Sequence, residues 1–314
     1  MTQPSVADVR AAAQRIAPDV RRVPLHPWDD GRIFLKLENL QPTGSFKVRG
    51  AANHLRAVVA ASGRVRGVIT ASSGNHGQAV AYVAQRLGIP AVVVVPETVN
   101  PLKAARIVGF GAELIRCGTT MRDRAVLANS LAQERGLHFV PSFDDPFVIA
   151  GQGTCGLELA DQAPSLAAVV VPAGGGGLIS GVALTLKALR PKMKVIGVEP
   201  SALPRFAASR AAGSRVEVPF RDTIADGLRG QTPGALTWDV TSQTVDEFVA
   251  VDDAATLDAV RRLFLDGHLV VEPSGAVAVA AVLSGLVRDR PVAAVISGGN
   301  LDPALLSTLF PDAS

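Results

Sequence analysis

The sequence predicts an α/β fold with open, mainly parallel twisted sheets and flanking helices. Strand-like and helix-like runs alternate along most of the 314 residues, which is the pattern of α/β proteins. Several strand candidates are continuous apolar runs, such as residues 92–95, and these are typical of strands buried on both faces of a parallel sheet. The length and a hydrophobic fraction of 48% suffice for two domains or one large α/β unit.

In the first half, apolar residues at helical spacing predict helices, and short apolar runs between Gly, Pro and polar turns predict strands. The predicted elements are helix 5–17, strand 33–38, helix 46–60, strand 67–71, helix 76–87, strand 91–95, helix 101–109, strand 112–116, helix 121–135 and strand 138–140.

The second half repeats this alternation and contains a polar stretch at 209–245 with Pro219, Pro233 and several glycines. We expect this stretch to be the longest loop region. The predicted elements of this half are helix 147–161, strand 168–171, helix 178–189, strand 194–198, helix 253–266, helix 274–287 and strand 292–296.

Composition and charge exclude several classes of protein. The net charge of +3 is small and no basic run with interleaved aromatic residues occurs, which argues against a nucleic-acid partner. Cys117 and Cys155 form no CxxC motif and have no histidine at ligand spacing, which indicates a reducing compartment without structural zinc or disulfides. The N-terminus lacks an apolar signal segment and no run reaches about 18 apolar residues, so we expect a cytoplasmic protein without a membrane partner.

The stretch Pro42–Gly50 places a lysine at the junction between a strand and a helix. Strand 33–38 leads into a Pro/Gly turn, and the next helix starts near Phe46. A cation in the first turn of a helix opposes the positive end of the helix dipole, so Lys47 has no local structural reason to lie there. An amine in that field has a lowered pKa, which favours imine formation with a carbonyl compound. Lys47 is therefore the first candidate for a catalytic residue.

Three further loops follow predicted strands, where ligands bind in open parallel sheets. The first is ASSGNHG at 71–77. Ser and Asn cap helix N-termini, so capping accounts for one or two of its polar residues. Seven consecutive small or polar residues exceed what a cap requires, and free N–H groups at a helix start can hold an anion such as a carboxylate.

The second loop is PAGGGGL at 172–178. Four glycines in a row cost backbone entropy, which argues against a purely structural turn, and they allow several N–H groups to converge on a phosphate. The rival is a dinucleotide fingerprint, since Gly175, Gly177 and Ser180 approximate G-x-G-x-x-G/A and Glu199 ends the next strand. The third glycine of that fingerprint is missing, so an NAD-dependent oxidoreductase is a remote alternative.

The third loop is ISGGN at 296–300, which taken alone is also compatible with a plain β-turn. Together the loops fit one ligand: Lys47 suits an aldehyde, the glycines suit a phosphate, and Ser297 suits a polar ring atom. Pyridoxal 5′-phosphate carries these three groups, so we predict it as the cofactor.

Over nearly the whole chain these residues resemble the fold-type II pyridoxal-phosphate enzymes, the tryptophan synthase β-like superfamily, and within them the threonine/serine dehydratase and serine racemase group. The matching segments are LKLENLQPTGSFKVRGA, SSGNHGQAVA, DDPFVIAGQGT, VPAGGGGLISG, TIADGL, EPSGAVA and SGGN. The resemblance implies two open sheets and a homodimer. It also implies a large domain of residues 1–63 and 145–314, a small domain of residues 64–144, and an active site in the cleft between them.

The resemblance also implies roles for individual residues. Lys47 is the Schiff-base lysine and accepts the Cα proton, and Phe46 lines the cofactor ring. Asn75 contacts the phenolic oxygen of the cofactor, and Ser297 faces its pyridine nitrogen. The substrate carboxylate meets groups of Ser72, Asn75 and His76. The cofactor phosphate is bound by Gly174, Gly175, Gly176, Gly177 and Leu178.

The implied reaction is β-elimination of a β-hydroxy amino acid, L-threonine or L-serine, to a 2-oxo acid and ammonia. Ser73 leaves racemisation open, because its hydroxyl could return a proton to Cα from the face opposite Lys47. Phe143 resembles the dehydratase form and would supply an apolar wall for a β-methyl group. We favour the dehydratase, and serine racemase, aspartate racemase and 3-hydroxyaspartate dehydratase are the alternatives.

One position departs from the pattern of the metal-binding relatives. Glu199 matches the first carboxylate of their divalent cation site, but Arg205 stands where those relatives have Asp. An arginine repels a divalent cation, and its guanidinium could pair with Glu199 instead. We therefore predict no metal here, the alternative being that Arg205 faces solvent.

Overall fold

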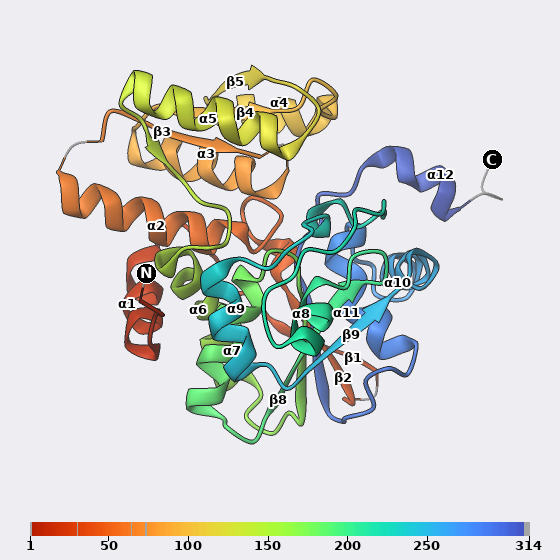
Figure 1. Cartoon of the computed structure of the whole chain (residues 1–314). Coiled ribbons are helices and arrows are strands. Elements are labelled where there is room, and N and C mark those ends of the chain that lie inside the picture. The colour runs from red at the N-terminus through yellow and green to blue at the C-terminus, as the bar shows by residue number, and fades with distance from the viewer. Residues whose placement is uncertain (1, 30, 64, 73, 311–314) are drawn as a thin grey trace.

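A computed structural model describes residues 2–29, 31–63, 65–72 and 74–310 of the chain. Within these ranges the strands form a six-stranded sheet, in the order β1-β2-β10-β7-β8-β9, and a four-stranded sheet, in the order β5-β4-β3-β6 (Figure 1). Strand β1 is antiparallel to β2, and the other pairs are parallel. The strands are β1 (Leu25–Asp29), β2 (Ile33–Leu37), β3 (Val68–Ala71), β4 (Ala91–Val95), β5 (Glu113–Arg116), β6 (His138–Phe139), β7 (Ala168–Pro172), β8 (Lys194–Pro200), β9 (Glu247–Val251) and β10 (Val292–Ile296).

The helices flank both sheets. Figure 1 shows α3, α4 and α5 with the four-stranded sheet in one lobe, and α2 running between this lobe and the other. Helix α2 packs against both α3 and α6, so it contacts both lobes. The helices are α1 (Val6–Ile16), α2 (Lys47–Ser62), α3 (Asn75–Leu87), α4 (Pro101–Gly109), α5 (Met121–Arg135), α6 (Pro146–Gln162), α7 (Gly177–Leu189), α8 (Arg205–Ala212), α9 (Ala235–Thr244), α10 (Asp253–Leu265), α11 (Pro273–Leu283) and α12 (Leu306–Leu309), with short 3₁₀ turns at Glu38–Leu40, Asp226–Leu228 and Pro303–Leu305.

Alternate residues of the central strands enter different hydrophobic clusters. On β10, Val292 and Ala294 belong to one cluster, whereas Ala293 and Val295 belong to another. Since successive side chains of a strand point to opposite faces, the central strands of the six-stranded sheet are buried on both sides. This explains why the sequence shows continuous apolar runs.

The predicted α/β class with mainly parallel sheets is confirmed. Every strand and helix predicted from the sequence is present, and α4 and α5 have the predicted bounds. The division into domains at 64 and 144 stays a prediction, which is consistent with the four-stranded sheet lying wholly between Val68 and Phe139. No helix in the described part of the chain is long and apolar enough to cross a membrane.

The expectation of a long loop region at 209–245 is confirmed for residues 213–234, which contain no α-helix or strand, but it is wrong at both ends of the stretch. Helix α9 occupies residues 235–244 of this stretch, and the end of α8 occupies residues 209–212. Threonine and serine, which are poor helix formers, make up four of the residues of α9, so local propensity gave no signal. The helix instead begins with a distant cap, because Asp144 accepts hydrogen bonds from the backbone N–H groups of Ala235 (2.9 Å) and Thr237 (3.0 Å).

The sequence analysis also missed two strands at the edges of the six-stranded sheet. Strand β1 contains Pro27, which a central strand does not tolerate but an edge strand does. Strand β9 has exposed and half-buried positions rather than an apolar run. Helix α11 ends at Leu283, four residues before the predicted end, and Gly285 follows with a φ of 70°.

Candidate active site

Lys47 is the first residue of α2, and Phe46 before it provides no side-chain cap. The Nζ atom donates a hydrogen bond to the carbonyl oxygen of Ser142 (2.7 Å) and lies 5.3 Å from the centre of the Phe46 ring. Burial lowers the pKa of Lys47 to about 8. The lowered pKa agrees with the sequence analysis, and its cause is loss of solvent around the amine.

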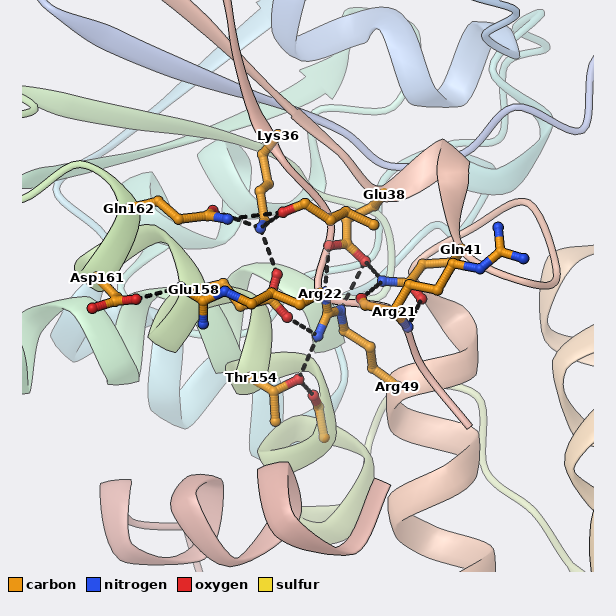
Figure 2. A network of polar contacts seen from close by, with 12 residues as sticks. Arg21, Arg22, Lys36, Glu38, Gln41, Arg49, Thr154, Glu158, Asp161 and Gln162 are labelled. Atoms are coloured by element: carbon orange, nitrogen blue, oxygen red, sulfur yellow. Dashed lines mark hydrogen bonds and ion pairs between the residues drawn. The ribbon is translucent and has the colours of Figure 1, made fainter. Parts of the chain in front are cut away.

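A buried ionic network fixes the segment that carries Lys47 (Figure 2). Arg49 donates two parallel hydrogen bonds to Glu38, from Nη2 to Oε1 (2.7 Å) and from Nε to Oε2 (2.8 Å). Arg49 Nη1 also pairs with Glu158 on α6 (2.8 Å), and Lys36 on β2 pairs with the same carboxylate (2.5 Å). Helix α2 is therefore held to β2 and α6 within one turn of the candidate amine.

The loop after β10 joins the turn before Lys47. The Phe46 N–H donates to the Ser297 carbonyl (3.1 Å), and Gly299 N–H donates to the Gly44 carbonyl (2.8 Å). Ser297 is buried, and its hydroxyl donates to the Ser274 carbonyl (3.3 Å). The two segments are about 250 residues apart in the sequence, yet they form one wall of the site.

The loop at 71–77 reaches the same wall through Asn75. The Asn75 amide donates to Glu272 Oε1 (2.5 Å) and accepts from the amide of Asn300 (2.6 Å). Arg106 on α4 in turn donates to Asn300 Oδ1. Burial, followed by the nearby carboxylate of Asp226, raises the pKa of Glu272 to about 7.

Sequence analysis missed Glu272, Asn300 and Arg106 as site residues. Glu272 lies in the EPSGAVA segment, which carried the family resemblance without any assigned role. Asn300 ends the SGGN loop, so its position after a strand was a usable signal. Arg106 had no signal, because it is one of two charged residues on an amphipathic helix.

The other residues of the loop at 71–77 have different surroundings. His76 is buried, and burial, followed by the Lys47 cation, lowers its pKa to about 3, so the ring is neutral. Its Nε2 lies 3.2 Å from the Val140 carbonyl, which accepts a hydrogen bond from the ring. The Ser72 hydroxyl accepts a long hydrogen bond from Gly74 N–H (3.4 Å). Ser73 lies outside the described residues.

The two central glycines of the loop lie where any side chain would clash. A Cβ at Gly175 would lie 2.5 Å from the ring of Phe143, and one at Gly176, where φ is 102°, would lie 2.7 Å from Thr237 Oγ1. Phe143 thus packs directly on the glycine loop. Helix α7 begins at Gly177 with no side-chain cap, so the N–H groups at its start are available to an anion.

These contacts bring the predicted loops together around Lys47. Ser142 accepts from Lys47, and the adjacent Phe143 packs on Gly175. A buried amine, a glycine loop at a helix N-terminus and the Ser297 hydroxyl are the groups that the aldehyde, phosphate and ring nitrogen of pyridoxal phosphate require. The donor set therefore fits this cofactor.

Arg205 and Glu199 form a completely buried pair, with Nε donating to Oε1 at 3.2 Å. The predicted pairing is confirmed, and the alternative that Arg205 faces solvent is wrong. In the part of the chain that the structure describes, no three His, Cys, Asp or Glu side chains are grouped to hold a metal ion.

Comparison with known proteins identifies the family. The family model described as "Pyridoxal-phosphate dependent enzyme" matches residues 16–298. The chain is 44% identical over 281 residues to an L-threonine ammonia-lyase of Thermotoga maritima, covering 89% of this chain and 70% of that protein. Among solved structures, maize serine racemase superposes with a TM-score of 0.92 at 36% identity, covering 98% of this chain and 97% of that one.

A threonine deaminase of T.th. superposes with a TM-score of 0.89 at 44% identity, covering 95% of this chain and 99% of that one. The same family is indicated by the two sheets, by the lysine at the start of α2 and by the sequence matches along the chain. The protein belongs to the family of pyridoxal-phosphate dependent enzymes with the type II fold, and pyridoxal phosphate is its cofactor.

Proposed function

We propose that this protein is an ammonia-lyase that converts L-threonine or L-serine to a 2-oxo acid and ammonia. The observation that carries the proposal is the partly buried amine of Lys47, whose pKa of about 8 leaves a reactive fraction uncharged near neutral pH. The similarity to a threonine ammonia-lyase and a threonine deaminase, each at 44% identity, supports this choice of substrate.

The chain supplies groups for each part of the reaction. When bound, pyridoxal phosphate acts as an electron sink next to the substrate Cα. The amine of Lys47 holds the cofactor through its aldehyde and, once released, accepts the proton from Cα. The Ser142 carbonyl orients the amine by accepting one of its N–H groups.

The remaining residues position the two molecules. The N–H groups of the glycine loop and Leu178 hold the phosphate, and the Ser297 hydroxyl meets the ring nitrogen. Asn75 contacts the phenolic oxygen, with its amide oriented by Glu272 and Asn300. Ser72, Asn75 and His76 receive the substrate carboxylate, and because the His76 ring is turned to Val140, its backbone N–H is the group offered.

In this proposal Phe143 makes the site selective for threonine over smaller substrates. Its ring packs on the glycine loop, so one face is fixed and the exposed remainder can form a wall for the β-methyl group.

We also propose a homodimer, in which each chain is divided into domains at residues 64 and 144; this expectation rests on the family resemblance. The free thiols of Cys117 and Cys155 support a cytoplasmic location.

A racemase is the second candidate, favoured by the similarity to maize serine racemase and by Ser73. The test is to incubate the holoenzyme with L-threonine, L-serine and 3-hydroxyaspartate and to measure 2-oxo acid, ammonia and the chirality of the remaining amino acid. The lyase predicts equal amounts of 2-oxo acid and ammonia, highest with threonine or serine. Formation of D-serine without 2-oxo acid would show a racemase, and Ser73→Ala should then abolish it while sparing any elimination.

A further inference from the structure

Arg205 lies in a closed cage of oxygen atoms. Its side chain is completely buried and donates to the Glu199 carboxylate (3.2 Å) and to three backbone carbonyl groups. The carbonyl partners and distances are Leu228 (2.7 Å), Gly230 (2.6 Å) and Ala173 (3.2 Å). The carboxylate also accepts from the backbone N–H groups of Phe206 and Ala207, each at 2.9 Å.

A carboxylate with several backbone carbonyls is the ligand set of a hard divalent cation. In this protein the guanidinium of Arg205 lies where such a cation would bind, because its planar fork of N–H donors reaches four oxygens at once. The charge also balances, since one carboxylate neutralises one guanidinium. A divalent cation would need a second carboxylate, so the cation expected from the metal-binding relatives does not fit this chain.

The cage surrounds the base of the glycine loop. Ala173 directly precedes Gly174, and Leu228 packs on Gly174, where an added Cβ would lie 3.1 Å from Leu228 Cδ2. Phe206, the neighbour of Arg205, packs on Gly176, where an added Cβ would lie 2.7 Å from its ring. Movement of Arg205 would therefore disturb the loop from two sides.

We propose that Arg205 is a tethered internal cation: it replaces a divalent metal ion and positions the glycine loop for the cofactor phosphate. The protein then needs no divalent cation to bind pyridoxal phosphate. This inference holds whichever β-hydroxy amino acid the enzyme uses, because it concerns the cofactor alone.

Arg205→Asp tests the proposal by exchanging the tethered cation for a second carboxylate. Without metal, two buried carboxylates repel each other, so we expect the melting temperature to fall and the dissociation constant for pyridoxal phosphate to rise about 10- to 100-fold. Magnesium or manganese should restore both, and saturating metal should raise the melting temperature of the variant by about 5 °C. The wild-type holoenzyme should respond neither to EDTA nor to added magnesium.

Two matched variants separate this role from a general loss of stability. Glu199→Gln combined with Arg205→Asp removes one metal ligand, so magnesium should no longer restore cofactor binding. Arg205→Lys keeps a cation that cannot reach all four oxygens, and it should bind the cofactor with intermediate affinity and without a response to magnesium. The proposal is overturned if magnesium stabilises the wild-type protein, or if Arg205→Asp binds the cofactor as the wild type does without metal or fails to recover with it.

Discussion

Lys36 and Lys47 lie on either side of the same turn, yet their surroundings are opposite. Lys36 is fully buried, and its amine donates to Glu158 (2.5 Å), Gln162 (2.9 Å) and the Val23 carbonyl (2.8 Å). Lys47 is only partly buried and donates to the Ser142 carbonyl. Among the described residues no carboxylate forms an ion pair with Lys47.

The difference between the two lysines shows how hydrogen-bond and ionic partners determine the role of a lysine. The partners of Lys36 satisfy all three of its N–H donors, so it serves to fix β2 against α6 (Figure 2). The carbonyl partner of Lys47 orients the amine without stabilising its charge by a full counter-ion, so the amine can lose its proton and react. We propose a structural role for Lys36 and a chemical role for Lys47.

Replacing each lysine by methionine, which keeps an unbranched apolar side chain but has no amine, should separate the two roles most clearly. Lys47→Met removes the reactive amine, so we expect activity to fall by at least about 10³-fold, and the visible band of the imine between lysine and cofactor, which borohydride removes in the wild type, should be absent. Lys36→Met leaves Glu158 without its closest cation, and we expect the free energy of unfolding to fall by about 3–5 kcal/mol.

Each variant controls for the other. Urea unfolding of Lys47→Met should show no loss of stability, and the folded fraction of Lys36→Met should keep the borohydride-sensitive band. The division between a structural and a chemical lysine would be wrong if Lys36→Met lost the band while folded, or if Lys47→Met kept it.

The parts of the fold predicted from sequence are those whose signals are local. Helix α5 begins with a capping box between Thr120 and Asp123, and α4 begins with Asn100 as its cap and Pro101 in its first turn, so both were predicted with the correct bounds. Helix α9 begins at a cap from Asp144, about 90 residues away, and no local pattern contains that information.

The candidate site shows the same distinction between local signals and contacts from distant segments. Lys47 and the glycine loop carry their signal in adjacent residues, so the sequence alone was enough to predict them as parts of the site. The partners that orient Asn75 come from other regions: Glu272 starts α11 and Asn300 follows β10. Chemical pattern can identify a reactive group, whereas the groups that orient it are set by the packing of distant segments.

Arg49→Lys tests the buried ionic network around Lys36, and we expect a smaller loss of stability than for Lys36→Met. Arg49 uses three nitrogens to bind Glu38, Glu158 and the Thr154 hydroxyl (3.0 Å). A lysine has a single charged nitrogen and cannot form the parallel pair with Glu38, so we expect urea unfolding to show a loss of about 1–3 kcal/mol. The cofactor band and the turnover of the folded variant should stay close to wild type. A loss of turnover without a loss of stability would show that this network acts on Lys47 directly.

A pH dependence tests the state of Lys47 itself in the protein stripped of cofactor. Burial sets the pKa of Lys47 at about 8, below its ordinary value of 10.5 in the unfolded chain. Between these two pH values the unfolded chain holds more protons at this group, so the contribution of Lys47 to the free energy of unfolding must rise with pH. Urea unfolding of wild type and Lys47→Met, compared from pH 7 to pH 10.5, should show the wild type gaining stability relative to the variant. A constant difference across this range would mean that the amine keeps an ordinary pKa, and Lys47 would then differ from Lys36 in its partners but not in its readiness to react.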